Sequence, residues 1–198
     1  MMFFPKNKQK LADLGIARVQ LFCQVNGLKI PSIEIIPKEG WYVNACAYYR
    51  KDSIKICLEE CQTPCPDANS RNWTWPGSTI DREPYGVLCH ELGHHCDLHT
   101  GNPSGPYYSD YSLKIQHESG EEAISGYNTG PEEWFAEMFR VLVTNPDLLR
   151  LTRPKTYALL IKKWTPVETQ NWLDAMGDNV PERVVKANRN KFVKKVKE

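Results

Sequence analysis

A cluster of histidines on one short segment constrains this chain more than any other feature. Four of the five histidines in the 198-residue sequence fall within ten consecutive positions: His90, His94, His95 and His99. The segment follows Asp81, which can cap a helix, tolerates Pro84 in the first turn, and ends before Gly101. The sequence therefore predicts a helix that runs through His99 and carries several imidazoles.

Two of these histidines are spaced to share one metal ion. His90-Glu-Leu-Gly-His94 is an H-E-x-x-H sequence, and residues i and i+4 lie one above the other on a helix. Glu91 lies beside them, where a carboxylate can polarise a metal-bound water molecule. Zinc suits two histidines and a carboxylate with an open position for water. His95 and His99 point to other sides of the helix, so we interpret them as packing or surface residues.

A third protein ligand has to come from elsewhere in the chain. The extended pattern H-E-x-x-H-x-x-G-x-x-H is excluded, because Asp97 and Thr100 occupy the positions of its glycine and last histidine. A helix predicted from the capping box at Thr129 to Thr144 offers Glu133 and Glu137 on one face. One of them can bind the metal while the other accepts a hydrogen bond from a ligand histidine. The long connection before this helix supplies competing ligands: His117, Glu118, Glu121 and Glu122.

These motifs resemble a known family. His90-Glu-Leu-Gly-His94, with Asp97 just beyond it, and Glu133-Trp-Phe-Ala-Glu137-Met-Phe-Arg140 resemble the motifs of the anthrax lethal factor catalytic domain. That domain and its relatives among zincin-like metallopeptidases read H-E-[FL]-G-H and E-F-F-A-E-x-F-R. The resemblance covers residues 80 to 145 of the chain. It implies a zincin-like fold and hydrolysis of peptide bonds in a protein or peptide substrate.

The resemblance also implies roles for individual side chains. Glu133 would be the third zinc ligand, Glu137 would hold a ligand histidine, and Glu91 would be the general base. Tyr127 would stabilise the oxyanion, with Tyr107, Tyr108 and Tyr111 as alternatives because Tyr127 stands one position away from the family's spacing. In zincins an edge strand beside the active-site helix pairs with extended substrate. We expect the segment Ser53–Glu60 to be that edge.

The rest of the chain predicts an α+β fold with a small mixed sheet and a helical C-terminal half. We expect a helix from Lys8 to Val25, a strand within 30–36, and a hairpin of 42–50 with 53–60. In that hairpin, residues whose numbers sum to 103 face each other. Beyond the long connection, which holds a short possible helix at 112–118, two shorter helices and one at 165–176 follow the helix that ends at Thr144. The expected zincin-like domain spans residues 1–181.

Four cysteines form a second candidate site. Cys57, Cys61 and Cys65 recur every fourth residue, and the hairpin places Cys46 opposite Cys57. The spacing leaves three interpretations open: a four-thiolate structural zinc site, a Cys46–Cys57 disulfide, and small buried residues without a special role. The first would give the chain a second Zn²⁺.

The charge distribution limits what the chain can bind. Its net charge of +1 excludes a strong overall field, but the predicted helical tail at 182–198 carries seven basic and two acidic residues. This tail could contact nucleic acid or an anionic surface, although a solvated terminal helix is the simpler interpretation. Trp73 and Trp75, in a loop-like stretch, could contact a ligand, although packing against the core is the simpler interpretation there as well.

The N-terminal segment and the lengths of the apolar runs bear on where the protein is found in the cell. We find no secretory signal and no apolar run of the roughly 18 residues that a membrane span needs, so we expect a cytoplasmic protein with reduced cysteines. The best-supported function is a zinc-dependent endopeptidase. The alternative is a zinc-stabilised binding or adaptor protein that contacts nucleic acid or protein through the basic tail and the tryptophan loop.

Overall fold

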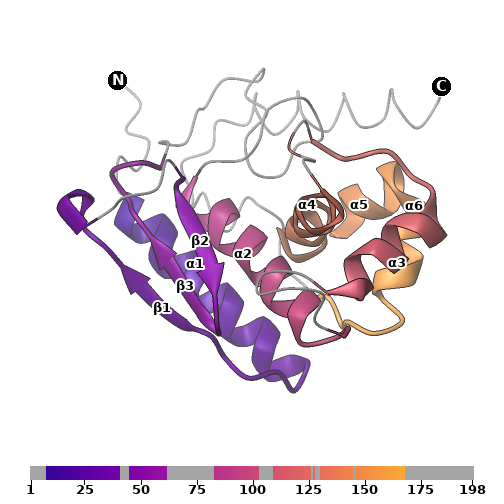
Figure 1. Ribbon diagram of the computed structural model, residues 1–198, viewed down its shortest axis with the longest axis horizontal. Helices are drawn as coiled ribbons and strands as arrows, with labels where there is room; N and C mark the ends of the chain where they lie inside the picture. The colour runs from indigo at the N-terminus through magenta and orange to yellow at the C-terminus, as the bar shows by residue number, and fades with distance from the viewer. Residues whose placement is uncertain are drawn as a thin grey trace.

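The fold combines a small mixed sheet with a larger set of helices, which confirms the α+β prediction (Figure 1). The computed structural model describes residues 8–40, 45–61, 83–102, 109–125, 127, 130–144 and 146–167. The helices are α1 (Lys8–Val25), α2 (Pro84–Leu98), α3 (Asp110–Ser119), α4 (Pro131–Thr144), α5 (Pro146–Thr152) and α6 (Pro154–Leu160). The strands are β1 (Ser32–Ile35), β2 (Ala47–Arg50) and β3 (Ser53–Ile56), and a 3-10 turn, η1, spans Lys38–Gly40.

The hairpin forms in the predicted register. Ala47 faces Ile56 and Tyr49 faces Ile54, and these four side chains point into the core. The two-residue turn between the strands has positive φ at both Lys51 (48°) and Asp52 (61°). Such angles match the right-handed twist of the strands, as two-residue hairpin turns require.

The expected substrate edge is wrong. The strand order is β1-β3-β2, with β1 parallel to β3, so β3 is the central strand and both of its edges are paired. Parallel pairing with the exposed strand β1 joins segments about twenty residues apart, and local sequence carries no signal for it. Among the described residues, the sheet edge that faces α2 and has no partner strand belongs to β2 instead.

Helix α2 lies at the centre of the molecule, between α1 and α4 (Figure 1). Nearly all of its residues are buried, and so is α4 from Trp134 to Thr144. Glycines allow the close crossings: a Cβ on Gly15 would meet Leu88, and a Cβ on Gly93 would lie 2.7 Å from the Cα of Ala136. Residues of α2 and α4 are therefore held in direct contact.

The other predicted elements are largely confirmed. Helix α1 has the predicted bounds, and the chain leaves it through Gly27 with φ +65°. Helix α3 is longer than the predicted stretch 112–118, and α5 and α6 are the two short helices. At the predicted helix 165–176, the described residues 165–167 are not helical, and residues 168–176 lie outside the described part, as do the tail at 182–198 and the tryptophan loop. Within the described part, no helix is both long and apolar enough to cross a membrane.

Candidate metal centre

Three potential metal ligands converge where α2 crosses α4. Oε2 of Glu133 lies 3.0 Å from Nε2 of His90 and 3.5 Å from Nε2 of His94. Two ligands on a tetrahedral zinc ion are separated by about 3.3 Å when each lies about 2.0 Å from the metal. These three side chains therefore form a group that could hold a metal ion.

Helical periodicity in α2 and the start of α4 place these three side chains. Successive turns of α2 place the rings of His90 and His94 5.0 Å apart on one face. Helix α4 begins at Pro131, which suits the first helical position, and Glu133 follows in its first turn, where a carboxylate interacts favourably with the helix dipole. Gly93, between the two histidines, lets α4 come close enough for Glu133 to reach them.

Glu137, one turn further along α4, orients His90. Its Oε1 lies 2.9 Å from Nδ1 of His90, and both of its oxygens accept hydrogen bonds from Arg140, each 2.9 Å long. A paired donation from a guanidinium fixes the plane of a carboxylate. Arg140 is only 1% exposed, so this chain of contacts is buried. Arg140 therefore has a role that the sequence analysis did not assign, although its i+3 spacing from Glu137 signals it.

The two nitrogens of His90 face two carboxylates, so its protonation decides what the site can bind. Burial lowers the pKa of His90, but the hydrogen bonds to Glu133 and Glu137 outweigh burial and raise it to about 10. Without a metal, both nitrogens therefore carry protons at neutral pH. A histidine that binds a metal through Nε2 needs the neutral form of the ring with its proton on Nδ1. The hydrogen bond from Nδ1 to Glu137 favours this form. Loss of the proton on Nε2 then leaves a lone pair directed at Glu133.

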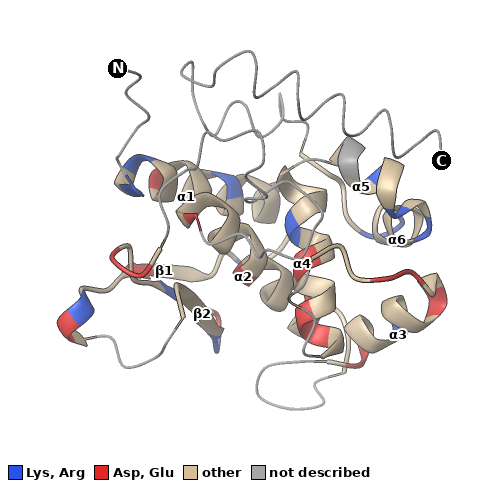
Figure 2. Ribbon diagram, turned by 90° about the horizontal axis from the view of Figure 1, so that it is seen from above, with Lys and Arg blue, Asp and Glu red and all other residues tan. Residues whose placement is uncertain are grey.

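The charge of the centre also fits a cation. Glu91, Glu133 and Glu137 bring three carboxylates together, whereas Arg140 supplies one permanent positive charge. Acidic residues appear on both α2 and α4 in the middle of the molecule (Figure 2). Because the surroundings are largely buried, this negative charge is weakly screened. Two imidazoles and a carboxylate are borderline-soft donors that suit zinc, so the residues present fit such an ion.

Glu91 lies beside the ligand group and also next to the sheet. Its side chain is buried, which raises its pKa, while His90 and His94 oppose that rise. The backbone of Tyr49 in β2 also hydrogen-bonds to this carboxylate. In the observed register, the N–H of Tyr49 points away from β3, toward the free edge of β2. The carboxylate of Glu91 therefore lies between the candidate metal ligands and the edge of β2 that pairs with no other strand among the described residues.

Tyr127 is the tyrosine that the structure brings to this centre. Its ring centroid lies 5.8 Å from that of His90, and its backbone N–H donates to Oγ of Ser125. Tyr111 is placed elsewhere, because its ring packs edge-on against Phe135 at 5.6 Å. Tyr107 and Tyr108 lie outside the described residues.

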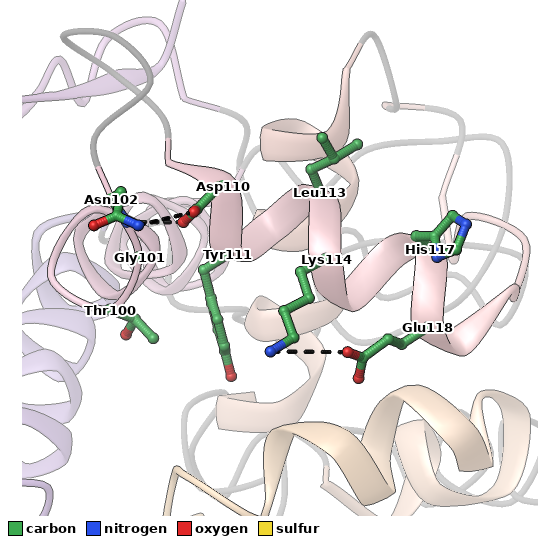
Figure 3. A pocket seen from close by; sticks show the side chains of 9 residues that line it. All are labelled: Thr100, Gly101, Asn102, Asp110, Tyr111, Leu113, Lys114, His117 and Glu118. Carbon is green, nitrogen blue, oxygen red and sulfur yellow. Dashed lines mark hydrogen bonds and ion pairs between the residues drawn. The ribbon is translucent and has the colours of Figure 1, made fainter.

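The four competing ligands do not join the group. His117 and Glu118 belong to a separate pocket of about 640 Å³ beside α3, where Glu118 pairs with Lys114 (Figure 3). The carboxylate of Glu121 accepts hydrogen bonds from the backbone N–H groups that begin α6. Glu122 is exposed, and its carbonyl accepts from Arg153. Glu133 differs from these residues because it lies where α4 crosses α2, within reach of both histidines.

The described cysteines do not form a second centre of this kind. Cys46, Cys57 and Cys61 are buried free thiols, so the disulfide interpretation is wrong. The sulfurs of Cys61 and Cys46 lie 3.4 Å from the carbonyl oxygens of Cys57 and Glu60, respectively. Hydrogen bonding to Cys46 and burial raise the pKa of Cys61, which keeps it protonated. The four-thiolate zinc site stays a prediction, since Cys65 lies outside the described residues.

His95 and His99 point away from the centre, as predicted. His95 is fully buried between Tyr49 and the backbone of Lys29, and burial lowers its pKa to about 4. His99 is partly exposed, with Nε2 2.6 Å from Oδ1 of Asp52. Both therefore contact the sheet side of the molecule rather than α4.

Replacing Glu137 by glutamine is expected to weaken metal binding at this centre by about 10- to 100-fold, the usual cost of losing the acceptor behind a ligand histidine. Glutamine keeps the length of the side chain but cannot accept from both His90 and Arg140 with a full negative charge. Zinc affinity is measured by competition with a chromophoric chelator. Glu118→Gln, an exposed carboxylate on α3, is the control and should leave the affinity unchanged. Equal affinities for the Glu137 variant and the native chain would show that Glu137 does not orient His90.

The centre thus combines three ligand groups, a separate carboxylate, a nearby tyrosine and a free strand edge. The sequence motifs identified the ligands, and the structure added Arg140 and the backbone of β2. Comparison of the chain with protein-family models, with curated proteins and with solved structures gave no match.

Proposed function

We propose that the chain is a zinc-dependent endopeptidase of the zincin-like class. The observation that carries the proposal is the position of Glu91, which is next to the group of His90, His94 and Glu133 but is not part of it. A structural metal site needs ligands and side chains that orient them, as Glu137 orients His90, whereas no hydrogen bond among the described residues joins Glu91 to any of the three ligand side chains. A hydrolytic site needs such a carboxylate as its base.

Each side chain has a role in this proposal. Zinc in such a site supplies an activated water molecule and a positive charge against the substrate carbonyl. Glu91 takes a proton from the attacking water and later gives it to the leaving amine. The raised pKa of Glu91 suits the first step, since a carboxylate with a higher pKa accepts a proton from water more readily. Tyr127 donates a hydrogen bond to the negative charge that develops on the carbonyl oxygen as water adds to the carbonyl carbon.

The edge of β2 is the proposed docking site for the substrate backbone, in place of β3. An extended peptide can add to the free edge of a strand through main-chain hydrogen bonds. The carboxylate of Glu91 already accepts from the backbone of Tyr49 on this edge. A peptide that pairs with β2 would therefore bring its carbonyl groups within reach of the base.

Hydrolysis of a random peptide library tests the proposal. The native chain loaded with zinc is expected to cleave internal peptide bonds, to lose this activity with a chelator, and to regain it when zinc is restored. Mass spectrometry of the products identifies the cleaved bonds. A protein that binds zinc at His90, His94 and Glu133 but cleaves no peptide would favour the binding-protein alternative.

A further inference from the structure

A second group of metal-ligand side chains lies on another side of α2. His95 and His99 are themselves spaced i, i+4, and their ring centroids are 4.3 Å apart. Asp52, from the turn between β2 and β3, meets both: Oδ1 lies 2.6 Å from Nε2 of His99 and 3.8 Å from Nδ1 of His95. One ligand atom from each of the three residues lies within 4.8 Å of the other two. The separations bracket the value of about 3.3 Å expected for ligands on tetrahedral zinc.

The hydrogen bonds of His95 direct a lone pair at this point. Nε2 of His95 lies 2.7 Å from the carbonyl oxygen of Lys29, which can only accept, so Nε2 carries the proton. In the neutral ring, Nδ1 is then unprotonated, and it lies 3.1 Å from the hydroxyl of Tyr49 and 3.8 Å from Oδ1 of Asp52. A metal ion bound to Nδ1 would take the place of the contact with the hydroxyl, which also donates to Asp52. Ligand histidines in metalloproteins commonly donate their other N–H to a backbone carbonyl in this way. The arrangement therefore supplies both a ligand and the contact that orients it.

The carboxylate of Asp52 is held in a matching orientation. Lys29 binds Oδ2 at 2.9 Å, which leaves Oδ1 directed at the two imidazoles. The hydroxyl of Tyr49 donates to Oδ1 at 3.1 Å and accepts from the backbone N–H of Asp52 at 3.2 Å.

A cation can reach the group from solvent. The side chains of His99 and Asp52 are 34% and 30% exposed, whereas His95 is fully buried beneath them. An ion bound there would be held by one buried and two accessible ligands, and water would complete its coordination. It would join the turn of the hairpin to the C-terminal end of α2, two elements that are more than 40 residues apart in sequence.

We propose that Asp52, His95 and His99 form a second binding site for a divalent transition-metal ion, for which zinc is the best match. Two imidazoles and one carboxylate are the donor types that zinc accepts. The site is independent of the proposed peptidase centre, since it shares no ligand with His90, His94 and Glu133. Its effect would be structural, because no further carboxylate of the described residues is placed beside it in the way that Glu91 is placed at the other centre.

The test counts metal ions in the full-length chain. The protein is stripped with a chelator and titrated with Zn²⁺ in competition with a chromophoric chelator, and Co²⁺ absorption reports the ligand field. The native chain is compared with His99→Ala and with His117→Ala, a matched control that removes an exposed histidine from α3. His99→Ala is expected to bind one equivalent fewer, or to bind that equivalent at least tenfold more weakly. His117→Ala should behave like the native chain.

A second set of measurements, in a variant that lacks one ligand of the peptidase centre, distinguishes metal binding at the two centres. His94→Gln removes a ligand of the peptidase centre, and an equivalent that is lost only when His99→Ala is added belongs to the Asp52 group. Asp52→Asn, which keeps the size of the side chain, serves if His99→Ala does not fold. Equal zinc stoichiometry and affinity in the native chain and in these variants would overturn the proposal and leave a hydrogen-bond network only. Peptidase activity is not a readout, so the result does not depend on the proposed function.

Discussion

The Glu91→Gln variant is expected to lose about 10²- to 10⁴-fold in kcat/KM for peptide hydrolysis, the usual contribution of a positioned general base. Glutamine has the same shape as glutamate and can still accept the hydrogen bond from the backbone of Tyr49. It cannot take a proton from water at neutral pH. Because Glu91 is not among the ligand atoms that converge on one point, zinc binding should persist.

The measurement pairs kinetics with elemental analysis. Cleavage of a peptide selected from the library is followed for the native chain, for Glu91→Gln and for Glu118→Gln, whose carboxylate is exposed on α3. The control is expected to retain native activity and native zinc content. A Glu91→Gln protein that cleaves at the native rate with stoichiometric zinc would refute the assigned role of Glu91. Loss of zinc together with activity would instead make Glu91 part of the metal-binding group.

The Gly93→Ala variant is expected to be less stable than the native chain by about 1–3 kcal/mol, the typical cost of inserting a methylene into a packed core. The added Cβ would lie 2.7 Å from the Cα of Ala136 and 3.2 Å from the Cβ of Phe139. The first of these is a backbone atom, so no side-chain rotation relieves the contact and the helices must separate. Alanine is intrinsically better than glycine in a helix by about 1 kcal/mol. A net loss of stability would therefore show that the contact between α2 and α4 dominates.

Urea unfolding followed by circular dichroism measures this effect. Gly40→Ala is the control, because among the described residues a Cβ there would meet Ile36 alone, at an ordinary distance of 3.5 Å, and its stability should change little. Separation of α2 from α4 also moves Glu133 away from His90 and His94, so zinc affinity should fall in the Gly93 variant. A Gly93→Ala protein with native stability and native zinc affinity would show that the crossing can relax without cost.

The local parts of the fold could be predicted because their signals lie within a few residues. Helix α1 ends at Asn26-Gly27, where glycine accepts a positive φ, and the hairpin register follows from a two-residue turn. The capping box at Thr129 indicated α4, which ends at Thr144 as predicted. The strand order did not follow from such signals, because the pairing of β1 with β3 depends on contacts between distant segments. That is why the expected substrate edge was wrong.

The two groups of candidate metal ligands also divide into parts set by local sequence and parts set by contacts between distant segments. Helical periodicity was enough to select His90 and His94 and to place Glu91 beside them, since i and i+4 always share a face. The pair formed by His95 and His99 has the same spacing, yet on its own helix it lacks a carboxylate partner. Asp52 supplies that partner from a turn 47 residues before His99.

The sequence alone was sufficient to select the two histidines of the candidate metal centre, the adjacent carboxylate of Glu91 and the helix that carries them, because each depends on spacing along one helix. It left the third ligand open among several acidic residues. Packing of α4 against α2 through Gly93 brings Glu133 to the histidines, and Arg140 holds Glu137 behind them. Those arrangements arise from contacts between segments remote in sequence, whose geometry is set by how the core fills space and not by any local pattern.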